Sequence, residues 1–132
     1  GGLMEPWVGN IEQETLGNDT FRTVVFTGEH TQLTVMSIEP GDDIGGEVHD
    51  GHDQFIRIES GSARVELGGS EGAPAMVQEV RDDWAVIIPS GTWHNVVNTG
   101  DEPLKLYSLY SPPEHPDGTV HRTKADAEAA EH

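Results

Sequence analysis

The amino-acid sequence predicts a single all-β domain, a barrel or a sandwich, with one short helix near its C-terminal end. Short runs rich in β-branched and aromatic residues recur along the chain, and clusters of Gly, Pro, Asn and Asp separate them at the spacing typical of such folds. The 132 residues suit one domain and are too few for two well-buried cores. Hydrophobic residues make up 34% of the chain but are gathered in these runs, which favours a modest core over disorder.

The hydrophobic runs predict nine strands, each bounded by residues that favour turns. Glu39-Pro40-Gly41-Asp42 places Pro and Gly where a tight turn needs them, and the glycine-rich segment 68–72 suits a flexible hairpin tip. The expected strands are Phe21–Thr27, Gln32–Ile38, Ile44–His49, Gln54–Glu59, Ala63–Leu67, Met76–Val80, Ala85–Ile88, Trp93–Asn98 and Leu104–Tyr110.

The C-terminal part of the chain predicts an irregular tail followed by the only convincing helix. Segment 111–118 has three prolines within five residues, which remove backbone donors and exclude regular structure. Thr123-Lys124-Ala125-Asp126 resembles a capping box that starts a helix running to Ala130. We expect the tail histidines His115 and His121 to be exposed, with folding over the barrel mouth as the alternative.

Composition excludes several classes of function. The chain has no cysteine, so disulfides, thiolate zinc sites and cysteine nucleophiles are excluded, and any metal must be held by nitrogen and oxygen ligands. Its 24 acidic and 7 basic residues give a net charge of −17, which disfavours nucleic acid and anionic membranes as partners. No apolar run approaches the ~18 residues of a membrane span. We therefore expect a cytoplasmic protein.

Two clusters of polar residues carry the candidate chemistry. On the expected strand Ile44–His49, Glu47 and His49 are two residues apart and share one face, and Gln54 can lie beside them across a hairpin. A turn at Pro89-Ser90-Gly91 brings His94 to the start of another strand. An inward-facing Glu47 would be costly unless it were paired or bound a cation, so a metal explains it best. A register slip of one residue would instead turn Glu47 and His49 outward as surface residues.

These clusters resemble the two signature motifs of the cupin superfamily. The first family motif has the order Gly, His-x-His, Glu, Gly, and the matching positions here are Gly41, Glu47, His49, Gln54 and Gly61. Glu thus replaces the first His, and Gln replaces the Glu. The second motif has the order Gly, Pro-x-Gly, His, Asn, matched here by Pro89, Gly91, His94 and Asn98, with Asp83 standing where the first Gly would be.

The resemblance covers about residues 20–110 and implies a double-stranded β-helix, or jelly-roll, cupin barrel. The single cupin domain would take in residues 4–132, with 111–132 as the proline-rich tail and short helix. The resemblance further implies one divalent metal ion held by Glu47, His49, Gln54 and His94, for which Zn²⁺, Fe²⁺, Mn²⁺ and Ni²⁺ are all chemically acceptable. Gln54 could instead orient a ligand, and His52 is then the rival fourth donor.

The same four residue types occur on zinc in phosphomannose isomerases, which are also cupins, with Gln and Glu apparently exchanged. The resemblance is therefore to the mannose-6-phosphate isomerase-like cupins. It implies Lewis-acid, isomerase-like catalysis on a small oxygenated compound, sugar-like or carbonyl. His52, Asp53 or a tail histidine could then move the proton, since histidine titrates near neutral pH. One alternative is an Fe(II) dioxygenase, suggested by two histidines and one carboxylate. The other is a ligand-binding or structural cupin without turnover. By family analogy we expect a homodimer.

Overall fold

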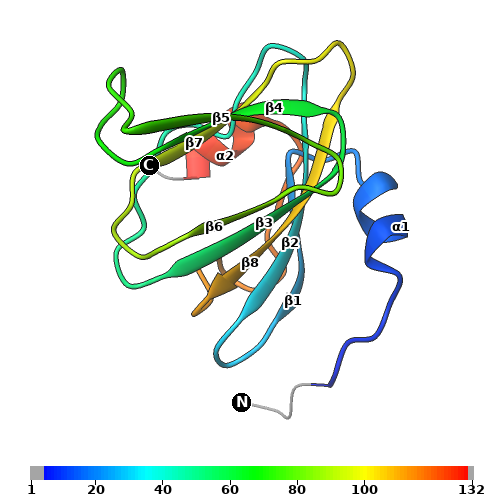
Figure 1. The fold of residues 1–132 in the computed structure, drawn as a ribbon. Coiled ribbons are helices and arrows are strands. Elements are labelled where there is room, and N and C mark those ends of the chain that lie inside the picture. Colours follow the sequence, from blue (N-terminus) through cyan, green and yellow to red (C-terminus); the bar gives the residue numbers. More distant parts are fainter. Residues whose placement is uncertain (1–4, 131–132) are drawn as a thin grey trace.

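A computed structural model describes residues 5–130 and contains two antiparallel sheets that face each other (Figure 1). The larger sheet has the strand order β6-β3-β8-β2-β1-β9 and the smaller one β5-β4-β7. The predicted all-β fold is confirmed, although the strands form an open sandwich of two sheets rather than a closed barrel. The strands are β1 Arg22–Thr27, β2 Gln32–Ile38, β3 Asp53–Ser60, β4 Ser62–Leu67, β5 Met76–Arg81, β6 Ala85–Ile88, β7 His94–Asn98, β8 Leu104–Ser111 and β9 Val120–His121.

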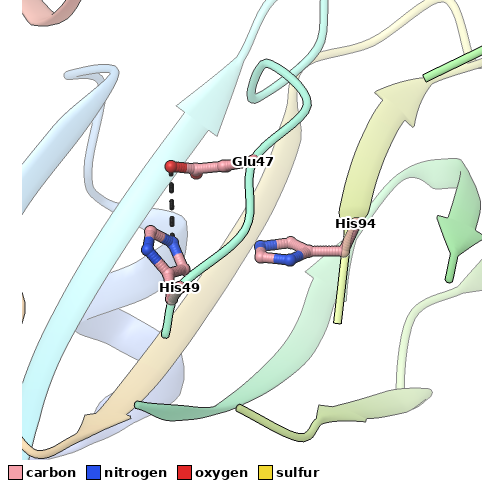
Figure 2. Close-up of side chains that lie close together, drawn as sticks. All are labelled: Glu47, His49 and His94. Atoms are coloured by element: carbon pink, nitrogen blue, oxygen red, sulfur yellow. Dashed lines mark ion pairs between the residues drawn. The ribbon is translucent and has the colours of Figure 1, made fainter. Parts of the chain in front are cut away.

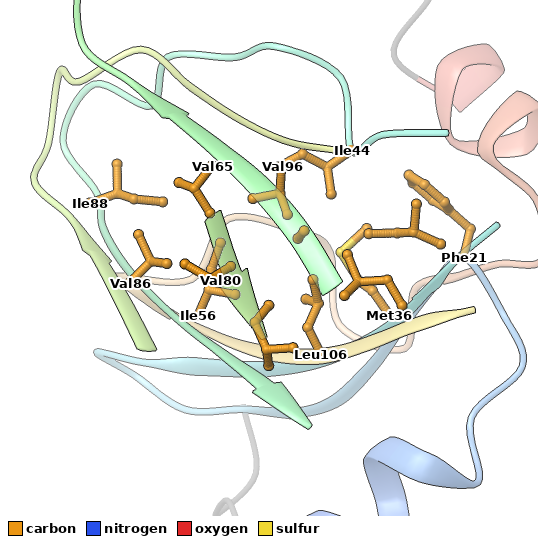
Figure 3. Packing of buried hydrophobic residues seen from close by; sticks show 14 of the residues in the cluster. Phe21, Met36, Ile44, Ile56, Val65, Val80, Val86, Ile88, Val96 and Leu106 are labelled. Atoms are coloured by element: carbon orange, nitrogen blue, oxygen red, sulfur yellow. The ribbon is translucent and has the colours of Figure 1, made fainter. Parts of the chain in front are cut away.

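The hydrophobic core fills the space between the two sheets (Figure 3). Along β3, Gln54, Ile56 and Ile58 are buried while the side chains between them are more exposed, as expected for a strand with one face on the core. Val65 of β4 and Val96 of β7 meet them from the smaller sheet. Each such aliphatic side chain contributes about 1.5–3 kcal/mol on burial. This packing holds the loop ends of both sheets in fixed positions.

A short N-terminal helix, α1 (Ile11–Leu16), was not predicted from the sequence. It lies against strands of the larger sheet, including β8 and β3, outside the core between the sheets (Figure 1). The Asn10 side chain caps it by accepting a hydrogen bond from the Gln13 N–H at 3.1 Å, and the Gly17 N–H bonds to the Gln13 carbonyl at 2.9 Å. These end signals are present in the sequence, but six residues are too few to show a helical apolar period.

The predicted C-terminal helix is confirmed as α2 (Lys124–Ala130). Thr123 and Asp126 form the capping box, in which each side chain accepts from the backbone N–H of the other, at 3.1 and 3.3 Å. Ala127 is buried in the core, and Lys124 forms an ion pair with Asp42 at 3.0 Å. These contacts hold a helix that is too short to be stable alone. No helix in the described part of the chain is both long and apolar enough to cross a membrane.

The expected strand Ile44–His49 is wrong, because this segment is part of an irregular loop between β2 and β3. Gly45 has a φ of +88°, a left-handed conformation that no regular strand contains, and its N–H donates to the Asp43 carboxylate at 3.1 Å. At Glu47 the loop meets β7, where Glu47 and His94 exchange two backbone hydrogen bonds of 3.0 and 2.9 Å. These two hydrogen bonds hold the loop against β7 at Glu47.

Candidate metal centre

Glu47, His49 and His94 bring their donor atoms within 4.8 Å of one another (Figure 2). Glu47 and His49 come from the loop before β3, and His94 is the first residue of β7. His94 is fully buried, and the His49 side chain is only 10% exposed. Both loop side chains therefore face inward, although no strand alternation directs them. The three groups form a set that can hold a metal ion.

The turn before β7 is bonded directly to the loop that carries His49. Gly91 adopts a φ of +81°, which favours glycine, and its N–H donates to the His49 carbonyl at 3.0 Å. The Ser90 hydroxyl accepts a hydrogen bond from the Gly51 N–H at 2.7 Å. The Pro-Ser-Gly turn therefore positions His94 and His49 together.

Three buried polar atoms at this centre, His49 Nε2, His94 Nε2 and Gln54 Oε1, have no hydrogen-bond partner among the described residues. His49 Nε2 lies 3.3 Å from Glu47 Oε2 but without hydrogen-bond geometry. His94 Nδ1 lies 3.2 Å from the Thr92 carbonyl, which only accepts, so Nδ1 carries the proton and Nε2 offers a lone pair. An unsatisfied buried polar atom costs about 1–3 kcal/mol. A divalent cation fits these atoms, because it would satisfy all three at once.

The electrostatics of the centre favour the forms of the side chains that bind metals. Burial by itself would raise the pKa of Glu47, but the neighbouring His49 imidazole, with further contributions from His94 and Arg22, holds it below its usual value. Burial lowers the pKa of His94, so this imidazole is neutral at neutral pH. Glu47 raises the pKa of His49, and Glu114 adds to this effect. A metal ion and a proton therefore compete for His49, since only the neutral imidazole can be a ligand.

The other three predicted site residues lie close by but in different settings. Gln54 is buried on β3, borders the same narrow space as His49 and His94, and places its Nε2 3.4 Å from the Ser108 hydroxyl. His52 lies beside His49, with 6.3 Å between ring centroids. Asp53 is exposed on the opposite face of β3 from Gln54, where its carboxylate accepts the Ser90 N–H at 3.0 Å. The structure thus brings Gln54 and His52 to the centre and leaves Asp53 outside it.

Sequence analysis missed Glu114, whose carboxylate bridges two histidines of the centre. One oxygen lies 3.4 Å from His49 Nδ1 and the other 3.1 Å from His52 Nε2. A carboxylate behind a ligating imidazole fixes the ring and raises its basicity. Glu114 lies 60 or more residues further along the chain, between prolines, and no local pattern connects it with the histidines.

The tail reaches this position because Gln32, a fully buried residue of β2, binds its backbone. The Gln32 side chain accepts the N–H groups of Glu114 and His115 at 3.1 and 2.9 Å and donates to the His115 carbonyl at 2.7 Å. The expectation that His115 is exposed is wrong, since its ring packs on Tyr110 with 5.2 Å between centroids. The tail therefore folds over the centre, and buried hydrogen bonds keep it there.

Comparison with known proteins finds matches at the level of family, sequence and structure. The family model described as "Cupin domain" matches residues 34–110. The uncharacterized protein YrkC of Bacillus subtilis (strain 168) is 55% identical over 127 residues, 96% of this chain and 68% of YrkC. The uncharacterized protein L612 of Acanthamoeba polyphaga mimivirus is 40% identical over 115 residues, 86% of this chain and 70% of L612. The crystal structure of BH2720 from Bacillus halodurans superposes with a TM-score of 0.92 at 54% identity, covering 95% of each chain.

Proposed function

The chain belongs to the cupin family, and from this premise we propose that it is a metal-dependent enzyme that acts on a small oxygenated compound. The observation that carries the proposal is the convergence of buried donor atoms without partners on a carboxylate. His49 Nε2 and His94 Nε2 would be ligands together with a Glu47 oxygen, and Gln54 Oε1 would be the fourth. Nitrogen and oxygen ligands of this kind suit Zn²⁺, Fe²⁺, Mn²⁺ or Ni²⁺.

When bound, the metal would supply Lewis acidity that polarises a carbonyl or hydroxyl group. The chain itself contributes a proton carrier at His52. Its Nδ1 lies 2.7 Å from the Pro112 carbonyl and must be the donor there, so Nε2, 3.1 Å from a Glu114 oxygen, is the nitrogen left to exchange a proton. A histidine placed in this way beside the centre is suited to act as a general acid or base. This supports isomerase-like chemistry, in the manner of the mannose-6-phosphate isomerase-like cupins.

A second candidate is an Fe(II) dioxygenase. Two imidazoles and one carboxylate on one side of an ion are the ligand set that leaves positions open for oxygen and substrate. The grouping of His49, His94 and Glu47 favours this candidate specifically. A cupin that binds a ligand without turnover would keep the metal but show neither activity.

Metal analysis tests the proposed centre. We expect the purified protein to bind one divalent ion per chain and to lose thermal stability in chelator, because a metal bound only by the folded state must stabilise it by about 3 kcal/mol at a hundredfold excess over Kd. H94A and H49A should lose the ion. H30A is the matched control, since His30 is an exposed histidine paired only with Glu29 at 3.6 Å. Metal-free protein with no response to chelator would contradict the proposal.

Activity assays on the metal-loaded protein separate the candidate functions. We expect interconversion of an aldose and a ketose within a panel of small sugars, and loss of that activity in H52Q with metal content retained. Oxygen uptake by the Fe(II)-loaded protein with diketones or phenols would favour the dioxygenase. A fully loaded protein that is inactive in both assays would favour the ligand-binding alternative.

A further inference from the structure

Arg22 of β1 is buried near the candidate metal centre and forms no ion pair with an acid in the described part of the chain. The residue is 4% exposed. Among the described residues, no carboxylate oxygen lies within 4.0 Å, the limit for an ion pair, of its guanidinium nitrogens. Three other cations of the chain do pair with acids, namely Arg57 with Asp83, Arg64 with Glu66 and Lys124 with Asp42. Buried charges are normally paired. In a chain with 24 acidic residues, a missing partner for Arg22 points to a ligand.

The groups that contact Arg22 leave part of its donor capacity unused. One terminal nitrogen lies 3.2 Å from His121 Nδ1, the guanidinium carbon lies 5.3 Å from the centre of the Phe21 ring, and the Tyr110 hydroxyl interacts with the same group. None of these neighbours carries a negative charge at neutral pH. The Nε atom is buried and has no hydrogen-bond partner in the described part of the chain. Arginine has five N–H donors in a planar fork, and the Nε–H donor of Arg22 lacks an acceptor here.

Arg22 and Glu47 line one cavity together. It is larger than the space on the Gln54 side of the centre, at about 510 Å³ against about 130 Å³ when adjoining open solvent is counted in both. Gly45, Gly46 and Glu128 also form part of its wall. The other cation in the wall, Lys124, is already paired with Asp42 and Asp43. A ligand in this cavity reaches Arg22 and the Glu47 side of the centre at once.

We infer that this cavity is the substrate site and that Arg22 binds the carboxylate group of a small organic acid in it. The inference rests on the proposed metal centre, because a divalent ion with Glu47 and two neutral imidazoles keeps one positive charge, to which Arg22 adds another. A carboxylate matches the guanidinium fork with two hydrogen bonds. A phosphate would bring a second negative charge beside Glu47 and Glu128, and the remaining cation in the wall, Lys124, is engaged. The expected substrate class is therefore a small oxygenated carboxylate, which for the proposed isomerase means a sugar acid rather than a neutral sugar.

Titration calorimetry with glycolate as the probe tests this site. The Zn²⁺-loaded protein is titrated with sodium glycolate at constant ionic strength, and neutral ethylene glycol is the control ligand. We expect glycolate to bind, ethylene glycol to bind far more weakly, and R22Q to weaken glycolate binding about tenfold or more through loss of the charged hydrogen bonds. R57Q, which removes a half-buried arginine of β3 that pairs with Asp83, should bind glycolate like the wild type.

A second measurement keeps the inference testable if R22Q does not fold. In a proton–nitrogen NMR spectrum of the wild type, the Nε–H signal that is missing from R22K should shift when glycolate is added. Glycolate that does not bind, binds R22Q as tightly as wild type, or leaves this signal in place overturns the inference even when Zn²⁺ binds. If no metal binds but glycolate still binds through Arg22, the metal proposal fails and the carboxylate site stands.

Discussion

At the scale of single residues, the candidate centre is defined by polar atoms that folding buries without partners. A core built for stability alone would satisfy or avoid such atoms, since each costs about 1–3 kcal/mol. His49 Nε2, His94 Nε2 and Gln54 Oε1 are instead buried side by side with a carboxylate whose pKa is held down. The free energy given up at these positions is what a bound cation would recover.

Substitution of Gln54 tests whether its side chain takes part in metal binding. In Q54M an unsatisfied amide oxygen is replaced by an apolar group of similar length, so we expect the metal-free protein to keep its stability or gain up to about 1 kcal/mol. Metal affinity should fall by roughly tenfold or more whether Gln54 is a ligand or orients one. Chelator competition measures the affinity and urea unfolding the stability, with the exposed Q78M as control. Unchanged affinity would remove Gln54 from the site.

At the scale of elements, the site depends on two irregular segments held against regular strands. The loop before β3 is fixed to β7 through the paired backbone hydrogen bonds of Glu47 and His94. The proline-rich tail is fixed to β2 through Gln32. Neither segment has regular secondary structure where it meets the site, so its position depends on bonds such as these to neighbouring strands and turns.

Removing the Gln32 side chain should release the tail. Q32A loses three hydrogen bonds to the tail backbone, and we expect the free energy of unfolding to fall by about 2–3 kcal/mol. Metal affinity should fall as well, because Glu114 would no longer be held against His49 and His52. Urea unfolding and metal competition measure the two effects. Q78A, which loses only an exposed bond to the neighbouring Glu79 carbonyl, should stay within about 0.5 kcal/mol of wild type.

The turn between β5 and β6 explains why the second family motif has a glycine where this chain has Asp83. Asp83 adopts a φ of +72°, in the left-handed region that favours glycine. We expect D83G to be about 1 kcal/mol more stable than D83A, since both lose the ion pair with Arg57 and only alanine keeps the Cβ strain. Thermal unfolding of D83G and D83A under the same conditions measures this difference. Equal stability of the two variants would show that a Cβ at position 83 is not strained.

At the scale of the whole molecule, the folded tail places a titratable group in the interior. Burial, with the nearby charge of Arg22, lowers the pKa of His115 from its ordinary 6.5 to about 4. The unfolded chain therefore binds a proton at His115 between these two pH values while the folded chain does not. By linkage, the unfolding free energy is therefore highest, as far as His115 is concerned, above pH 6.5, and it decreases progressively as the pH falls towards 4.

Comparison with H115F isolates this effect, because phenylalanine keeps the ring against Tyr110 but does not titrate. Between about pH 7.5 and about pH 4.5, wild type should lose on the order of 2 kcal/mol more unfolding free energy than H115F. Both proteins are measured in chelator, so that metal release does not contribute. Groups common to both, including His49 with its raised pKa, cancel in the difference. If the unfolding free energies of wild type and H115F change with pH in the same way, His115 is not buried in its neutral form.

The sequence by itself determined the all-β fold, eight of the observed strands, the capped C-terminal helix and the turn that presents His94. These features follow from local rules, namely alternation of apolar residues, turn-forming glycines and prolines, and side chains that cap a helix three residues away. The positions of Glu47, His49, Gln54 and His94 were also readable, because the motifs keep fixed spacings.

The tertiary structure alone decided what surrounds those residues. It replaced the expected strand Ile44–His49 by a loop, brought Glu114 and His115 over the centre, and placed Arg22 in the same cavity wall as Glu47. Each of these contacts joins segments separated by 25 or more positions in the sequence, and none leaves a periodic or adjacent pattern there. Such contacts form only when the two sheets pack, because packing is what brings loop, tail and first strand to one place.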